Sequence, residues 1–348
     1  MQIQVALASF GMSGKIFHAP FLHIHPNFNL YACVERSQKN IQQYYPATKS
    51  FSDFETILAD ENLQLVIINT PNTTHFDLAT KALLAGKHIV VEKPFTVTTE
   101  EADQLMALAA KQQLEIFVFH NRRYDSDFIT IKQIIQQGLL GSIVECEIHF
   151  DRFSQNVSNK LHKEIPVKGT GVLYDLGSHI IDQALQLFGM PKAVFADIFA
   201  MRSVSKVDDY FELLLYYPNK RVRLKASYLV KEQPFGYMIH GTEGSFIKPK
   251  TNVQENDLTS GLLPQLINNN WGKEDEKDWG ILNIQIDGKE RREKFPSLQG
   301  NYMQFYTEVY NCLVHKHPSP VLAIEGRMVI QLIEAAYKSV TNGTIVHL

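Results

Sequence analysis

The sequence predicts an α/β protein built from two domains, and three observations support that prediction. Strand-like and helix-like stretches alternate over the first 120 residues, which is typical of βαβ units and a parallel sheet. Several strand-like stretches then follow one another with alternating polar and apolar residues, which is typical of an α+β domain with a large, mostly antiparallel, open sheet. A length of 348 residues fits two domains of ordinary size. We therefore expect one domain over residues 1–120 and a second over residues 121–348.

Short apolar runs separated by amphipathic stretches define the elements of the first domain. A glycine follows the second predicted helix, where left-handed backbone ends helices, and Thr99 with two glutamates after it resembles a capped helix start. Strands are expected at residues 3–8, 29–34, 65–69, 88–91 and 115–118, and helices at residues 52–60, 76–85 and 99–111.

In the second domain, apolar residues recur at every second position instead. In residues 142–151 the side chains of Val144, Cys146, Ile148 and Phe150 alternate with polar ones, so we expect a strand with one wet face. A polar loop is expected at residues 155–170, and residues 252–299 show no readable pattern. Helices are expected at residues 128–138, 178–188, 302–315 and 325–341, and strands at residues 193–199, 210–217, 221–229, 237–240 and 344–347.

Composition and charge narrow the class of protein. The net charge is −3 and there is no basic patch, so we expect neither nucleic acid nor a membrane surface as a partner. The N-terminus predicts a first strand rather than a signal peptide, and no apolar run approaches the ~20 residues that span a bilayer. The three cysteines, Cys33, Cys146 and Cys312, are few and far apart, which favours a reducing cytoplasm over a disulfide framework.

A glycine-containing turn follows the first predicted strand. The dinucleotide-binding fingerprint of Rossmann domains is G-x-G-x-x-G between a strand and a helix, where free N–H groups and the helix dipole favour a pyrophosphate. The second and third glycines of that pattern are Gly11 and Gly14, while Ser9 replaces the first. We therefore predict a Rossmann nucleotide-binding domain whose cofactor contacts come from this turn, at Phe10, Gly11, Met12, Ser13 and Gly14.

The end of the second strand bears on which dinucleotide is bound. Glu35 lies 21 positions after Gly14, close to the spacing of the acidic residue that binds the adenosine ribose of NAD. Arg36 beside it suits the 2′-phosphate of NADP or a stacked adenine. The two residues indicate different cofactors. We favour NAD because Glu35 occupies the strand end, and NADP remains an alternative.

Two further strand ends contribute candidate cofactor contacts. The third strand runs into a polar turn with Thr70, Pro71, Asn72 and His75, of which the last two also suit helix capping. The fourth strand ends in Glu92-Lys93-Pro94. Because proline cannot continue a central strand and ligands of open α/β sheets bind at the carboxyl ends of the strands, we expect Lys93 to reach a ligand.

A carboxylate and a histidine open a helix of the second domain. Asp175 and His179 are four positions apart and Asp182 is three further on, so on a helix they share a face. A histidine flanked by carboxylates beside apolar residues suits proton transfer with a hydroxyl group, although a capping aspartate and a core histidine explain the same pattern. A metal site is not expected, because no third ligand with recognisable spacing accompanies the two residues.

These motifs occur together in one known family. Their order along the chain, ending with Asn121-Arg122-Arg123 and Asp175-Leu176-Gly177-Ser178-His179, resembles the glucose–fructose oxidoreductase, inositol dehydrogenase and rhizopine catabolism family (Gfo/Idh/MocA). Phe17–Phe21 (FHAPF) and Phe150–Phe153 (FDRF) further resemble its scyllo-inositol dehydrogenase-like subgroup. The segment Lys160-Leu161-His162-Lys163 departs from that subgroup, so substrate contacts there are not carried over.

The resemblance implies a nicotinamide-dependent oxidoreductase with a C-terminal α/β domain that binds substrate and forms a homodimer or higher homo-oligomer through its sheet. It implies that Lys93, Asp175 and His179 carry catalysis and that Glu92 and Asn121 contact the cofactor. The substrate is expected to be a secondary alcohol of a sugar, inositol or related polyol.

Five residues are candidates for contact with that substrate. They are Lys93, Arg123, Arg152, Asp175 and His179. Two rival readings of the whole chain are a dinucleotide-sensing regulator without catalysis and an NAD-dependent glycosidase of the same fold.

Overall fold

The computed structural model describes residues 2–36, 39–158, 160, 163–266 and 270–348, which divide into two compact units. Unit 1 comprises residues 1–121, 254–271 and 301–327, and unit 2 comprises residues 122–253, 272–300 and 328–348. The chain thus returns twice to unit 1 after leaving it. That discontinuity has no counterpart in the expected division into residues 1–120 and 121–348.

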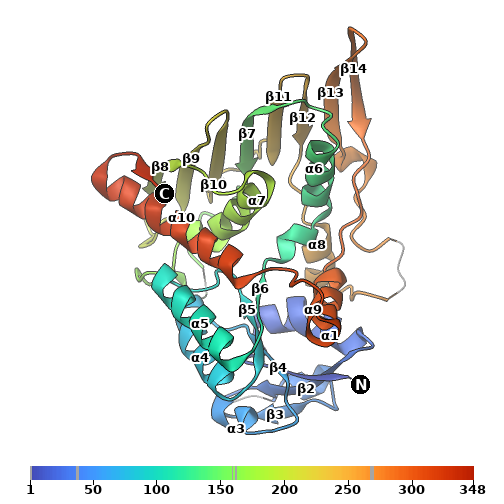
Figure 1. The fold of residues 1–348 in the computed structure, drawn as a ribbon, viewed down its shortest axis with the longest axis vertical. Coiled ribbons are helices and arrows are strands. Elements are labelled where there is room, and N and C mark those ends of the chain that lie inside the picture. The colour runs from blue at the N-terminus through green and yellow to red at the C-terminus, as the bar shows by residue number, and fades with distance from the viewer. Residues whose placement is uncertain (1, 37–38, 159, 161–162, 267–269) are drawn as a thin grey trace. The chain divides into compact units, whose positions relative to one another are not determined.

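Unit 1 contains a parallel sheet of six strands within the described residues, in the order β3-β2-β1-β4-β5-β6 (Figure 1). The strands are β1 (Ile3–Leu7), β2 (Phe28–Val34), β3 (Lys49–Phe51), β4 (Leu65–Ile68), β5 (His88–Glu92) and β6 (Ile116–Phe119). The strand order reverses between β1 and β4, which is the doubly wound arrangement whose switch point binds dinucleotides. The predicted Rossmann-type domain is confirmed.

Helices complete unit 1. They are α1 (Ala19–Ile24), α2 (Ile41–Tyr44), α3 (Phe54–Leu58), α4 (His75–Leu84), α5 (Thr99–Gln112), most of α8 (Val253–Thr259) and α9 (Met303–His315). The cap of α5 is Thr98, one residue before the expected Thr99, and it forms a capping box with Glu101. Gly86, at φ +74°, ends α4 as expected.

The strands of unit 1 that lie nearest the centre of the sheet are fully buried. Every residue of β4 and the run Ile89–Val91 of β5 have no exposed surface. This is why those strands appear in the sequence as continuous apolar runs. The edge strand β3, with the sequence KSF, has no apolar run and was not predicted.

Unit 2 contains a sheet of nine strands within the described residues, in the order β14-β13-β12-β11-β7-β10-β9-β8-β15. All pairs are antiparallel except β7 with β10, which confirms the predicted mostly antiparallel sheet. The strands are β7 (Ile143–His149), β8 (Ala193–Phe199), β9 (Tyr210–Tyr216), β10 (Arg221–Ser227), β11 (Tyr237–Gly241), β12 (Gly244–Lys248), β13 (Gly280–Ile286), β14 (Lys289–Phe295) and β15 (Val346–His347).

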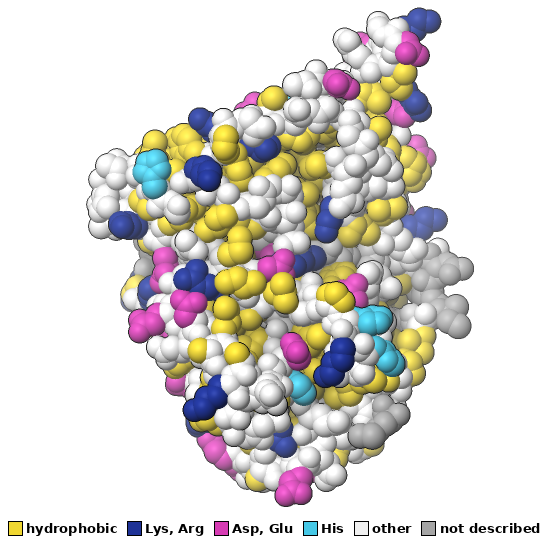
Figure 2. Space-filling model, in the orientation of Figure 1, with side chains coloured by type: hydrophobic (Ala, Val, Ile, Leu, Met, Phe, Trp, Pro, Cys, Tyr) yellow, Lys and Arg dark blue, Asp and Glu magenta, His cyan; other side chains and the backbone are white. Residues whose placement is uncertain are grey.

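One face of this sheet is buried against helices and the other is polar. The buried face contributes Cys146, Leu213 and Leu224 to a core shared with α6 (Ser126–Gln136), α7 (Ser178–Phe188) and α10 (Ala323–Asn342), the last of which begins in unit 1. Most side chains of the other parity are exposed or half-buried. On the side of unit 2 that carries α7 and α10, the surface visible in Figure 2 mixes hydrophobic side chains with Lys and Arg.

Candidate functional site

The glycine turn after β1 is pinned by an asparagine from the end of β4. Asn69 accepts a hydrogen bond from the Ser9 N–H (3.0 Å), donates one to the Ser9 carbonyl (2.9 Å), and its carbonyl accepts one from the Ser9 hydroxyl (2.9 Å). Ser9, which replaces the first fingerprint glycine, therefore helps to hold the turn through the hydrogen bond of its hydroxyl. Sequence reasoning missed Asn69 because it was counted as the last residue of a strand.

A dinucleotide fits this turn. A Cβ at Gly14 would lie 2.6 Å from the Ser9 carbonyl oxygen and 2.9 Å from the Asn69 amide nitrogen, so the position requires glycine. A Cβ at Gly11 would meet only the Ser9 hydroxyl, at 3.9 Å, so the backbone there lies open to a ligand. A π-helical turn, Gly14–His18, follows and leads into α1. The backbone geometry that brings a pyrophosphate against glycine N–H groups is present.

Two other predicted residues of the turn differ in exposure. The Phe10 ring is buried and packs against Tyr44 and Tyr45, at centroid distances of 5.9 and 6.3 Å. Met12 is half exposed, at 49%. The aromatic contacts join the glycine turn to α2, the helix that follows β2.

Glu35 and Arg36 stand at the carboxyl end of β2, next to the end of β1. The Glu35 carboxylate accepts hydrogen bonds from the N–H groups of Asn40 (2.8 Å) and Ile41 (3.2 Å) and from the Ser50 hydroxyl (2.9 Å). It thus satisfies N–H groups at the start of α2. Arg36 is exposed.

The turn after β4 is linked to the segment after β5 by a buried histidine. His75 has no exposed surface, and its two ring nitrogens lie 3.0 Å from the carbonyl oxygens of Thr70 and Pro94. Burial lowers the pKa of this imidazole, against hydrogen bonds that raise it. The ring therefore joins two predicted cofactor loops through their backbones. Asn72 begins a short 3₁₀ turn beside it, and Pro71 precedes that turn.

Glu92 connects the glycine turn to Lys93. One carboxylate oxygen accepts a hydrogen bond from the Ser13 hydroxyl and lies 3.1 Å from His18 Nε2, and the other accepts one from the Lys93 N–H (3.1 Å). Burial alone would raise the pKa of this carboxyl, but the His18 and Ser13 hydrogen bonds outweigh it and hold the pKa below its usual value. Glu92 thus fixes the backbone of Lys93 relative to the turn.

The network continues to α9. His18 Nδ1 lies 2.9 Å from the Tyr306 hydroxyl, which donates to the Phe17 carbonyl oxygen at 2.7 Å. Burial raises the pKa of Tyr306 well above its ordinary value. Tyr306 lies nearly 300 residues from His18 along the chain, so no local signal in the sequence could have paired them.

Lys93 itself is half-buried and precedes Pro94 through a cis peptide bond. Asn121, the remaining predicted cofactor contact, is buried at the end of β6, the strand next to β5. Within unit 1 the structure therefore brings the predicted cofactor residues to the carboxyl ends of adjacent strands, as expected.

In unit 2, Asp175 and His179 lie on consecutive helical turns of different kinds. Asp175 belongs to a π-helical turn, Leu173–Gly177, and His179 to the first turn of α7. The Asp175 carboxylate pairs with Lys163 Nζ at 2.7 Å. The His179 ring is 6% exposed and its centroid lies 6.0 Å from that of Phe150. Sequence reasoning missed Lys163, while Leu161 and His162 of the same segment lie outside the described residues.

The two arginines proposed to contact substrate have different surroundings. Arg123 forms a bidentate pair with Asp182, with Nε to Oδ2 at 2.8 Å and a terminal nitrogen to Oδ1 at 2.6 Å. Both side chains are nearly buried, at 9% and 3% exposure. Arg152 is exposed, with its guanidinium 5.4 Å from the Phe150 ring centroid. Arg152 therefore has the more accessible cation of the two.

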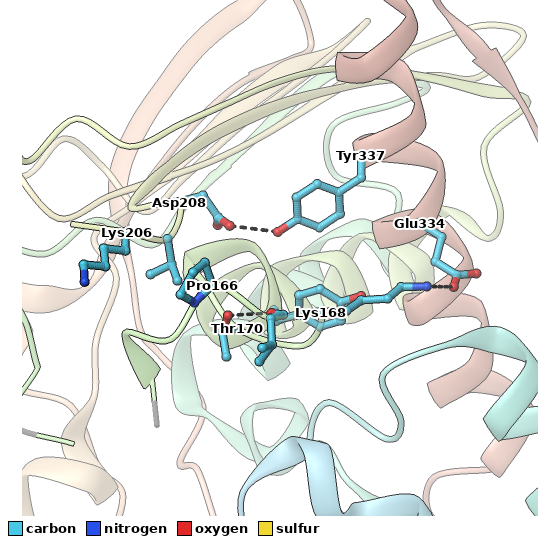
Figure 3. A pocket seen from close by; sticks show the side chains of 10 residues that line it. Pro166, Lys168, Thr170, Lys206, Asp208, Glu334 and Tyr337 are labelled. Atoms are coloured by element: carbon cyan, nitrogen blue, oxygen red, sulfur yellow. Dashed lines mark hydrogen bonds and ion pairs between the residues drawn. The ribbon is translucent and has the colours of Figure 1, made fainter. Parts of the chain in front are cut away.

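A cavity of about 490 Å³ lies elsewhere in unit 2 (Figure 3). It contains none of the predicted site residues, although Tyr174 in its wall precedes Asp175. Asp208 accepts a hydrogen bond from the Tyr337 hydroxyl at 2.8 Å and burial raises its pKa, while Lys168 pairs with Glu334 at 2.9 Å. Four polar side chains of this wall are thus already paired with one another.

Two kinds of feature are absent from the residues that the structure describes, a metal-binding cluster and a membrane span. No group of three or more His, Cys, Asp or Glu side chains there is arranged to hold a metal ion. Among the helices described, none has the length and apolar character needed to cross a membrane.

Comparisons with known proteins agree with this architecture. A family model described as "Oxidoreductase family, NAD-binding Rossmann fold" (GFO_IDH_MocA) matches residues 3–120. A second, "Oxidoreductase family, C-terminal alpha/beta domain", matches residues 132–348.

Individual relatives match over nearly their whole length. An uncharacterized oxidoreductase of Escherichia coli, YdgJ, is 38% identical over 97% of this chain and 96% of its own. The scyllo-inositol 2-dehydrogenase (NADP(+)) IolW of Bacillus subtilis is 35% identical over 97% of this chain and 93% of its own. A crystal structure of a Bacteroides fragilis protein classed with the oxidoreductases has 43% identity and a TM-score of 0.91, with full coverage of both chains.

Proposed function

This chain belongs to the Gfo/Idh/MocA oxidoreductase family, and we propose that it transfers a hydride between a nicotinamide cofactor and a secondary alcohol of a sugar, inositol or related polyol. The observation that carries the proposal is the Glu92 network. Because Glu92 bonds the Ser13 hydroxyl and the Lys93 N–H, Lys93 is held at the strand ends where the glycine turn lies. The relative named as a scyllo-inositol dehydrogenase supports the substrate class.

In unit 1, the residues of the proposed cofactor site bind and orient the ligand. Gly11 and Gly14 admit the pyrophosphate to the backbone, and His75 fixes the two loops that flank it. The bound nicotinamide supplies the hydride acceptor or donor.

In our proposal Lys93 donates a hydrogen bond to the reacting oxygen and favours its negative charge. His179 accepts the hydroxyl proton, and Asp175, with its Lys163 partner, orients the substrate. Lys93 belongs to unit 1 and the other two residues to unit 2, so their convergence on one carbon is part of the proposal.

The experiment is a screen at 340 nm of polyols and aldoses with NAD and NADP in parallel, followed by Lys93→Met. Losing the ammonium should lower turnover by roughly 10²–10⁴-fold while cofactor binding stays nearly intact. Lys111→Met, an exposed lysine in the last turn of α5, is the matched control and should change neither. Near-normal turnover in Lys93→Met would refute the assignment. Cofactor binding without any turnover would favour the sensing regulator, and glycoside cleavage without net reduction the glycosidase.

We further propose that the polar face of the unit 2 sheet forms a homodimer. Phe195 and Phe199 on β8 are 41% and 60% exposed, and Arg223 on β10 pairs with Glu147 and Glu212 on the flanking strands. Apolar side chains around a paired charged centre suit a self-complementary interface. Light scattering should give about twice the chain mass of 39.7 kDa, and a monomer would contradict the proposal. The free, buried cysteines favour the cytoplasm.

A further inference from the structure

We propose that this chain prefers NADP(H) to NAD(H), with Arg36 as the ligand of the 2′-phosphate and Glu35 as a positioning residue that does not read the ribose. The inference rests on the proposed dinucleotide site and names its specificity. It reverses the preference for NAD that the position of Glu35 in the sequence suggested.

The carboxylate of Glu35 has a limited capacity to accept hydrogen bonds. An ionised carboxylate has about four lone-pair directions. Oε1 accepts from Asn40 N–H and, at 3.3 Å, from Ile41 N–H, while Oε2 accepts from Ile41 N–H and the Ser50 hydroxyl. Three donors therefore occupy the carboxylate, with the Ile41 N–H shared between its two oxygens, and at most one lone-pair direction is left. A ribose whose two hydroxyls both bonded to Glu35 would have to displace one of these donors and leave it without its partner.

Two of the donors to Glu35 belong to the helix beside the glycine turn. Asn40 and Ile41 begin α2, whose last residue, Tyr44, packs against Phe10 of the glycine turn at 5.9 Å. The carboxylate of Glu35 thus fixes the helix that covers one side of the turn. Turning Glu35 toward a ribose would release that helix, and the expected cost is the loss of charge-assisted hydrogen bonds.

Positively charged side chains near the ends of β1 and β2 remain available to a ligand. Lys15 Nζ lies 5.3 Å from the Tyr44 ring centroid and 5.4 Å from that of Phe10. Arg36 and Lys39 are exposed, and neither forms an ion pair in the part of the chain that the structure describes. The strand ends β1 and β2 are adjacent. Three cationic residues thus lie on the segments that follow β1 and β2, and the Glu35 carboxylate on the same segment as Arg36 already has hydrogen-bond donors, which suits an additional phosphate group.

Arg36 is the best placed of these cations. It directly follows the strand-end residue, where an arginine accommodates a 2′-phosphate. Its planar guanidinium can bind phosphate oxygens through two hydrogen bonds, which a lysine cannot do. Lys15 and Lys39 then contribute positive charge but not the paired hydrogen bonds that a guanidinium can form with a phosphate.

The test measures binding rather than turnover. Isothermal titration of the full-length protein with NADP⁺, NAD⁺, 2′,5′-ADP and 5′-AMP gives four dissociation constants. We expect NADP⁺ to bind at least about tenfold more tightly than NAD⁺, since one charge-assisted contact is worth about that factor. The 2′,5′-ADP and 5′-AMP pair should show the same ratio, because the discrimination lies at the adenosine end.

Two variants separate the roles. Arg36→Ala should remove the preference for the 2′-phosphate and leave NAD⁺ binding within about twofold, whereas Lys111→Ala, an exposed cation on α5, should change nothing. Glu35→Gln should lower thermal stability but leave the NADP⁺ to NAD⁺ ratio unchanged, because the carboxylate does not face the phosphate.

Other results would contradict either the proposed preference for NADP(H) alone or the proposed function as well. NAD⁺ binding as tight as NADP⁺, or a preference that survives Arg36→Ala, overturns this inference alone. A Glu35→Gln variant whose ratio shifts strongly toward NADP⁺ shows that Glu35 reads the ribose and also overturns it. Failure of both dinucleotides to bind would overturn the proposed function as well.

Discussion

Arg123 and Asp182 form the most instructive pair for mutation, because a substrate contact and a positioning role predict different measurements. The bidentate pair lies within unit 2, and Asp182 stands three residues after His179 on α7. Replacing Arg123 with Met would leave the Asp182 carboxylate in a site where only 3% of it is exposed.

The expected loss follows from that burial. Removing one partner of a buried ion pair costs about 3–5 kcal/mol, because the remaining charge has lost its compensation. At about 2–4 °C per kcal/mol for a domain of this size, the melting temperature should fall by roughly 6–20 °C. Arg123→Met with Asp182→Leu should recover most of the loss, since neither charge remains.

The assay combines urea unfolding followed by circular dichroism with steady-state kinetics on the alcohol found in the screen. We expect Arg123→Met to lose stability with an unchanged KM. Arg123→Lys should lose less stability, because it keeps the positive charge although it cannot form the bidentate pair. An unchanged unfolding midpoint together with a KM raised about tenfold would refute this reasoning and make Arg123 a substrate contact.

Two further predictions concern unit 2. Lys248 and Glu274 form a fully buried pair at 2.5 Å, so Lys248→Met should reduce the free energy of unfolding by about 3–5 kcal/mol; a loss under about 1 kcal/mol in urea unfolding would contradict this. Burial alone would lower the pKa of His149, but hydrogen bonds that its ring donates to the Asp151 and Glu147 carboxylates outweigh it and raise the pKa. The resulting stability is fully present below the unfolded value of about 6.5 and is lost as pH rises through the higher folded value. Unfolding free energies at about pH 6 and pH 9 should therefore differ more for the parent than for His149→Asn, and equal differences would rule the effect out.

The sequence predicts helices and strands well where burial imposes a regular spacing of apolar residues. The continuous apolar run Ile89–Val91 marks a strand that is buried on both faces. The alternation of polar and apolar residues around Cys146 marks a strand that is buried on one face only. The edge strand β14, with the sequence KERREKF, is mostly exposed and has no such spacing, so it was not predicted. The π-helical turns, including Leu173–Gly177, likewise have no sequence signature of their own.

The residues of the candidate site likewise fall into those that could be predicted from the sequence and those that could not. Residues at strand ends, such as Glu92 and Lys93, could be found because topology brings the carboxyl ends of parallel strands together. Their partners could not, because His18 meets Tyr306 only through the folded chain. Glu35 illustrates the remaining limit. Its position was read correctly as a strand end, but only the hydrogen-bond geometry reveals which donors use its oxygens.

The division of unit 1 among three stretches of chain affects how the protein is made. On the ribosome, residues 1–121 emerge before α9, whose Tyr306 stacks on Phe21 at 5.7 Å and contacts Phe28 and Phe119. At ~5–20 residues per second, that wait lasts roughly 10–40 s. During this interval Phe21, Phe28 and Phe119 lack the aromatic partner that they have in the folded unit, and exposed apolar surface of this kind favours aggregation until α9 has been made.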